Sequence, residues 1–161
     1  MRLRLILVGI SCLGLASCSE VYEVRAEVRD GQIVFTAEKD WFRERCVSEI
    51  EVLAEGADST PSSPQSALQS DAENRPAFVT VWRDSGGSLE DLGDDCENRF
   101  PVRYGEPLAG KPLDRPPQLG PVGAKPLARG VVHKIRTTTH LGEHGWGSFV
   151  IHRDGTVENL D

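Results

Sequence analysis

The sequence predicts an all-β domain, an antiparallel β-sandwich of about six to eight strands. No segment of the chain after its N-terminal apolar stretch repeats apolar residues at the period of a helix over about ten or more positions. Several short segments instead alternate apolar and polar residues, which is typical of strands with one buried face. All ten prolines lie between Pro61 and Pro126, so the segments on either side can pair in sheets.

The first flank predicts a hairpin over residues 21–37. From Tyr22 to Arg29 apolar residues alternate strictly with charged ones. The dipeptide Asp30-Gly31 follows, which suits a type I′ turn, and residues 33–35 resume the apolar run. A connection at residues 41–46 then leads to a third strand near residues 47–53.

The middle of the chain predicts loops around one clear strand. Residues 56–76 are rich in small and polar residues without apolar periodicity, which predicts a long mobile loop. Residues 78–82 predict a strand with Phe78 and Trp82 on one face. Residues 107–126 contain six prolines, which predict an extended, solvated path rather than a central strand.

The C-terminal flank returns to strands. Residues 131–139 are rich in β-branched side chains, and residues 148–153 are apolar again. A second turn dipeptide, Asp154-Gly155, then leads into a short strand at residues 156–160. A brief pairing of residues 100–104 completes the expected set.

Residues 1–17 have the three parts of a secretory signal peptide: a basic start, a short apolar middle and small residues at the end. The tetrapeptide from Leu15 to Cys18 resembles the lipobox of bacterial lipoproteins. The resemblance implies cleavage before Cys18, a diacylglyceryl thioether on its sulfur and acylation of the new amine. Two or three acyl chains anchor a protein stably in a membrane. The mature domain would then comprise residues 18–161.

The same resemblance guides the expected location. In enteric lipoproteins an Asp after the lipidated Cys favours the inner membrane, and Ser19 is not Asp. We therefore expect the periplasmic face of the outer membrane, with the inner membrane as the second choice. An ordinary cleaved signal peptide or an uncleaved anchor are the alternatives.

Charge argues against nucleic acid as a partner. The chain has 18 Lys and Arg against 25 Asp and Glu, a formal net charge of −7. A protein whose binding depends on neutralising phosphates uses Lys and Arg side chains, so this balance disfavours such a partner. The expected partners are the membrane, through the lipid, and an unknown envelope protein or glycan.

Two cysteines remain in the mature chain after lipidation, Cys46 and Cys96. In an oxidising periplasm such a pair predicts a disulfide, and two reduced buried thiols are the alternative. Closing a loop of this span stabilises a fold by about 4 kcal/mol in the chain-entropy treatment.

No catalytic motif predicts an enzyme. The chain lacks a nucleophile elbow, a zinc-protease helix motif and a phosphate loop. We expect a non-enzymatic structural or binding module without a cofactor. A hydrolase with a triad assembled in space and a metal-binding module remain the alternatives.

Two groups of residues bear on the metal alternative. Acids crowd residues 84–97 without calcium-ligand spacing, so a solvated loop is expected there. His140 and His144 could bind zinc or copper only if His133 or His152 joined them across a sheet.

The expected recognition site is the glycine-rich stretch after residue 139. Gly142, Gly145 and Gly147 surround Glu143, His144 and Trp146, three side chains able to make specific contacts. We expect a loop here, with Trp146 as the anchor for a partner. The alternative is that Trp146 folds back over the sheet edge.

Overall fold

The protein is all-β. The computed structural model describes residues 21–38, 45–56, 77–86, 97–112 and 114–160, and these contain eight strands, one short 3-10 helix and no α-helix. The strands are β1 (Val21–Arg29), β2 (Gln32–Ala37), β3 (Val47–Glu55), β4 (Phe78–Ser85), β5 (Val102–Arg103), β6 (Val132–Thr139), β7 (His144–Ile151) and β8 (Val157–Leu160), and the 3-10 helix is η2 (Pro117–Leu119).

Several predicted features lie outside the described residues. These are the signal peptide and Cys18, most of the predicted connection at 41–46, nearly all of the predicted loop at 56–76, and most of the predicted acidic loop at 84–97, including Cys96. Within the described ranges, no helix is long and apolar enough to cross a membrane.

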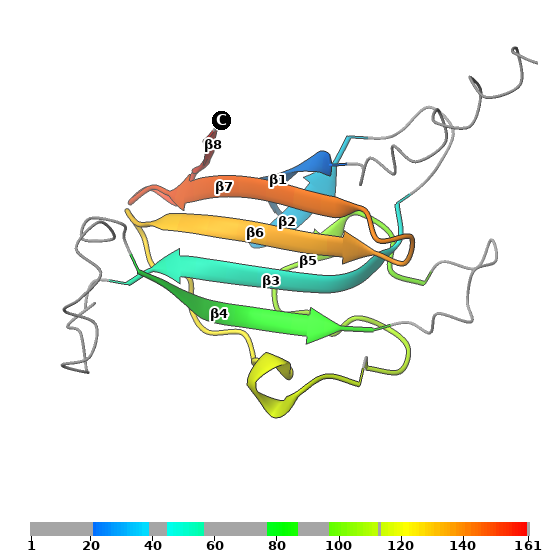
Figure 1. Cartoon of the computed structure of the whole chain (residues 1–161). Helices are drawn as coiled ribbons and strands as arrows, with labels where there is room; N and C mark the ends of the chain where they lie inside the picture. The colour runs from blue at the N-terminus through cyan, green and yellow to red at the C-terminus, as the bar shows by residue number, and fades with distance from the viewer. Residues whose placement is uncertain (1–20, 39–44, 57–76, 87–96, 113, 161) are drawn as a thin grey trace, which may run out of the picture.

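The strands form one curled mixed sheet in the order β4-β3-β6-β7-β1-β2-β5, with β8 beside β7 (Figure 1). All neighbours are antiparallel except β1 and β7, which run parallel. The prediction of an all-β fold is confirmed, but the sheet is not the purely antiparallel sandwich that we expected. Apolar periodicity identifies the buried face of a strand, but it does not identify which strands pair with its two edges or in which direction they run.

β1 changes partner halfway along its length. Residues 21–23 pair with β7, whereas residues 24–29 pair with β2 as the predicted hairpin. Asp30 and Gly31 form the turn between these strands with φ of 52° and 76°, as their residue types predicted. β1 therefore links the hairpin to the rest of the sheet.

Beyond the point where β1 departs, β8 takes over the same edge of β7. Residues 157–160 pair with residues 148–151 of β7. The side-chain amide of Asn159 reaches β1: its Oδ1 accepts from the Ala26 amide at 2.7 Å, and its Nδ2 donates to the Ala26 carbonyl at 3.0 Å.

Two glycines of β7 allow this close packing. A Cβ on Gly147 would lie 1.8 Å from the Val24 carbonyl oxygen, and one on Gly145 would lie 2.2 Å from Thr137 Oγ1. The expectation of a loop through these glycines was wrong, because β7 begins at His144 rather than near Ser148. Gly147 makes room for the backbone of β1 and Gly145 for the side chains of Thr137 and Tyr22. The turn itself is confined to residues 140–143.

The curl of the sheet brings distant strands into one core. The ring of Phe35 on β2 lies 6.3 Å from Trp82 on β4 and 6.0 Å from Phe149 on β7, centroid to centroid. β2 and β4 lie near opposite ends of the strand order, so this contact requires the sheet to fold over on itself. Burial of such aromatic rings is a main contribution to stability.

A β-bulge in β4 changes which residues enter the core. Val52 pairs with Trp82 and Leu53 with Thr80, which leaves one extra residue, Val81, between them. Phe78 and Trp82 therefore do not share a face as predicted. Trp82 is in the core, whereas Phe78 is partly exposed beneath the ammonium of Lys134, 4.0 Å from the ring centroid.

The proline-rich segment, residues 107–126, covers the edge of β4. Arg83 and Val122 exchange backbone hydrogen bonds of 3.0 and 2.8 Å, and the Lys125 amide donates to the Val81 carbonyl. The Tyr104 hydroxyl donates to the Lys125 carbonyl at 2.6 Å, and burial raises the pKa of Tyr104 to about 12. The segment follows the extended path that its prolines predicted, and it blocks pairing of β4 with another chain.

Candidate recognition surface

Five side chains from five neighbouring strands lie opposite one another on the outer face of the sheet, the face turned away from the core. Cross-strand pairing puts Arg83 of β4 opposite Glu51 of β3, and Glu51 opposite Arg136 of β6. The pairing continues from Arg136 to Trp146 of β7, and from Trp146 to Glu23 of β1. We call this set the transverse row.

Glu51 is the electrostatic centre of the row. Its Oε1 accepts from Arg83 Nε at 3.1 Å and from Thr80 Oγ1 at 2.9 Å, and a further hydrogen bond comes from Arg83 Nη2. Arg136 Nη1 lies 3.9 Å from the other carboxylate oxygen. The Glu51 side chain is only 15% exposed, so its attraction to both guanidinium groups is screened less than at an open surface. The carboxylate thereby helps to hold Arg136 against β7.

Arg136 in turn packs on the indole of Trp146. The guanidinium carbon lies 5.1 Å from the ring centroid, a cation–π contact, and the Trp146 residue remains 47% exposed. A large aromatic side chain held in place yet open to solvent is typical of binding surfaces.

A groove of about 480 Å³ opens beside Trp146, where β1 leaves β7 and β8 begins. It combines charged and amide side chains with an aromatic ring. Its lining residues are Glu23, Val24, Lys134, Arg136, Trp146, Gly147, Ser148, Asn159 and Leu160.

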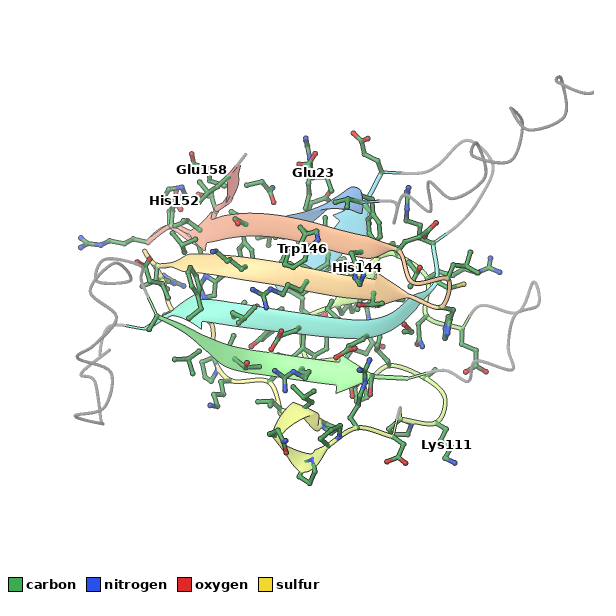
Figure 2. The ribbon with its side chains drawn as sticks, in the orientation of Figure 1. Glu23, Lys111, His144, Trp146, His152 and Glu158 are labelled. Atoms are coloured by element: carbon green, nitrogen blue, oxygen red, sulfur yellow. The ribbon has the colours of Figure 1, made fainter. Side chains whose placement is uncertain are left out.

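The structure separates the three predicted recognition residues. His144 and Trp146 are two residues apart on β7 and point to the same side of the sheet, and both are exposed (Figure 2). Glu143 is buried and belongs to the opposite side. Of the predicted set, only His144 and Trp146 belong to the outer surface.

Glu143 instead closes the β6–β7 turn from within. Its Oε2 lies 3.2 Å from Thr139 Oγ1, and its amide donates to the same hydroxyl oxygen at 3.1 Å. Arg45 Nε lies 4.0 Å from this carboxylate, and the Arg45 guanidinium also lies over the ring of Tyr22. Burial raises the pKa of Tyr22, whose hydroxyl is paired with Thr137 Oγ1 at 2.7 Å.

The histidines do not gather. His133 is fully buried against Phe149, with their ring centroids 4.9 Å apart. His152 Nε2 lies 2.8 Å from Glu158 Oε2 at the far end of β7. Across the described part of the chain, no three His, Cys, Asp or Glu side chains are placed to hold a metal ion. Asp84, the first of the predicted acidic stretch, accepts from the Leu108 amide at 2.7 Å.

A second groove, of about 500 Å³, lies beside the β1–β2 hairpin. Arg25 and Arg29 line it, and each pairs at 2.7 Å with a glutamate on its own strand, Glu23 or Glu27. The hydrogen bond from Arg29 holds the pKa of Glu27 below its usual value. Unlike the groove beside Trp146, this groove has no exposed large hydrophobic side chain among its described lining residues, so the groove beside Trp146 is the stronger candidate.

Comparison with known proteins found no match, whether with protein-family models, with curated proteins or with solved structures. The transverse row was not predicted from the sequence. The alternating polar positions were visible on each strand, but the strand order and register that align them were not.

Proposed function

We propose that this chain is a lipid-anchored envelope lipoprotein that acts as a non-enzymatic binding module. It captures an envelope partner with the surface around Trp146. The observation that carries the proposal is the half-exposed indole, held by Arg136 beside a groove on the outer face. Such a fixed aromatic anchor loses little conformational freedom when it binds.

The chemistry of the groove favours a protein partner over a glycan. Glu23, which pairs with Arg25 at 2.7 Å, brings negative charge to the groove, and Lys134 and Arg136 bring positive charge. Charges of both signs suit a protein surface with complementary charges. A sugar ring would stack on an indole face, and Arg136 already covers one of the two faces of this indole.

The lipid anchor and the location at the periplasmic face of the outer membrane rest on the N-terminal sequence. Metabolic labelling with a fatty-acid analogue tests the anchor. The wild type is expected to incorporate the label and Cys18→Ala to lose it. Unchanged label in the variant would contradict lipidation at Cys18.

We also propose that Cys46 and Cys96 form a disulfide. The backbone of Cys46 forms a β-bridge with Arg99, and the Val47 amide donates to the Asn98 carbonyl at 2.8 Å. The chain two residues after Cys96 therefore runs beside Cys46. Alkylation of the unreduced protein, read by intact mass, is expected to modify neither thiol, and two modified thiols would refute the pair.

Photo-crosslinking in cells tests the binding function. A photoreactive residue at Lys134, which lines the groove, is placed in three forms of the full chain: otherwise unchanged, with Trp146→Ala and with Val79→Ala. Val79 is a matched control, because it is 52% exposed against 47% for Trp146 and does not line the groove.

A protease-sensitive adduct that Trp146→Ala reduces at least tenfold, and Val79→Ala leaves unchanged, supports the proposal. An adduct that survives protease and disappears with glycan-degrading enzymes would identify a glycan and overturn the choice of a protein partner. Equal adducts in all three forms would overturn the site.

A further inference from the structure

Strand β1 begins very close to the proposed lipid anchor. Its first residue, Val21, is three positions after Cys18. Consecutive Cα atoms are about 3.8 Å apart, so this tether spans at most about 11 Å. A lipid on Cys18 would therefore hold the start of β1 within about 10 Å of the membrane surface, a distance of about two strand spacings.

The same end of the sheet exposes apolar side chains. Val21 pairs with His144 at the start of β7, and the turn between β6 and β7 carries Leu141 (Figure 1). Val21 is 65% exposed and Leu141 is 56% exposed. Both side chains thus lie at the end of the sheet where β1 begins, and apolar side chains near a lipid anchor can enter the membrane interface.

The turn holds Leu141 in a defined position. The Gly142 amide donates to the Thr139 carbonyl at 3.0 Å, and Gly142 has φ of 79°, a conformation that favours glycine. The buried hydrogen bonds between Glu143 and Thr139 fix the turn from inside. Leu141 is thus presented by an ordered turn.

We propose that the β6–β7 turn lies on the bilayer in the lipid-anchored protein, with Leu141 and Val21 in its interfacial region. The inference rests on the lipid anchor of the proposed function and adds the orientation of the domain. The strands then rise from the membrane, and Trp146 lies two residues above His144, about 7 Å along β7. The groove beside Trp146 would open sideways, close to the membrane surface.

Depth-dependent fluorescence quenching tests this orientation. The full lipidated chain carries an environment-sensitive dye on Leu141→Cys or, as the control, on Val79→Cys. Val79 is similarly exposed at 52%, and it lies near the opposite end of the sheet, where β4 begins. Each protein is reconstituted into phosphatidylcholine vesicles containing a spin-labelled lipid, and wild-type protein treated with the dye corrects for any label on native cysteines.

The dye at position 141 is expected to be quenched at least threefold more than the dye at position 79. Protein that floats with the vesicles but shows equal quenching at both positions would overturn the membrane contact alone. Protein that fails to float would overturn the lipid anchor and, with it, this inference. A dye on Val21→Cys repeats the measurement if Leu141→Cys does not fold.

Discussion

The side-chain amide of Asn159 satisfies both backbone polar groups of Ala26. Asn159 lies on β8 and Ala26 lies on β1. Both strands pair with the same edge of β7, β1 with residues 144–146 and β8 with residues 148–151. The amide thus acts as a short piece of strand where regular pairing has stopped. It joins the C-terminal strand to the hairpin that begins the domain.

Asn159→Ala is expected to lower the free energy of unfolding by about 1–3 kcal/mol, because it leaves the partly buried amide and carbonyl of Ala26 without partners. The control is Glu158→Ala, which removes only an exposed contact with His152 and is expected to cost less than about 1 kcal/mol. Urea unfolding monitored by tryptophan fluorescence measures both. Equal losses would show that the bridge does not stabilise the junction.

Gly147→Ala is expected to destabilise the fold by about 1–3 kcal/mol or more, since the new Cβ would collide with the Val24 carbonyl. Gly123→Ala is the matched control, because nothing lies within 4 Å of a Cβ at that position. Thermal unfolding of both variants checks the difference. A fully stable Gly147→Ala protein would mean that β1 and β7 can separate at little cost.

Trp146→Ala is expected to change the free energy of unfolding by less than about 1 kcal/mol, because it removes an exposed ring from the outer face. Trp82→Ala, which empties a core position, is expected to cost about 3–5 kcal/mol. Chemical denaturation of the two variants separates a binding role from a packing role. A loss at Trp146 as large as that at Trp82 would assign the indole to packing.

The free energy of unfolding is expected to decrease as the pH is lowered, because of His133. Burial lowers the pKa of its ring below the usual 6.5, partly opposed by the nearby backbone of Val131. The unfolded chain then takes up a proton before the folded one does, so acid favours unfolding once the pH drops through about 6.5. The neutral imidazole therefore makes its full contribution to the free energy of unfolding above about pH 6.5. As the pH falls below that value, this contribution decreases by up to about 1.4 kcal/mol per pH unit.

Comparison of the wild type with His133→Leu isolates this group from the carboxylates. The free energy of unfolding of each protein is measured from pH 7.5 to pH 5. The wild type is expected to lose stability relative to the variant as the pH falls. A difference that is independent of pH would contradict a buried, neutral imidazole.

Much of the strand content could be predicted from local patterns. The alternation from Tyr22 to Arg29, the turn at Asp30 and Gly31, and the β-branched run of β6 each depend on neighbouring residues only. The extended path of the proline-rich segment could be predicted in the same way, because proline has no backbone N–H to donate to a neighbouring strand. Trp146 was found as a single exposed candidate for the same reason: it lies between glycines in a polar stretch.

The sequence by itself determined an all-β chain, most of its strands, the turn at Asp30 and Gly31, and the lipobox-like N-terminus that predicts an anchored lipoprotein. Tertiary structure alone decided the parallel pairing of β1 with β7, the bulge at Val81 and the inward turn of Glu143. It also aligned Arg136 with Trp146. The reason is physical: a two-residue period states which face of a strand is buried, whereas strand order and register depend on contacts between residues far apart in the chain.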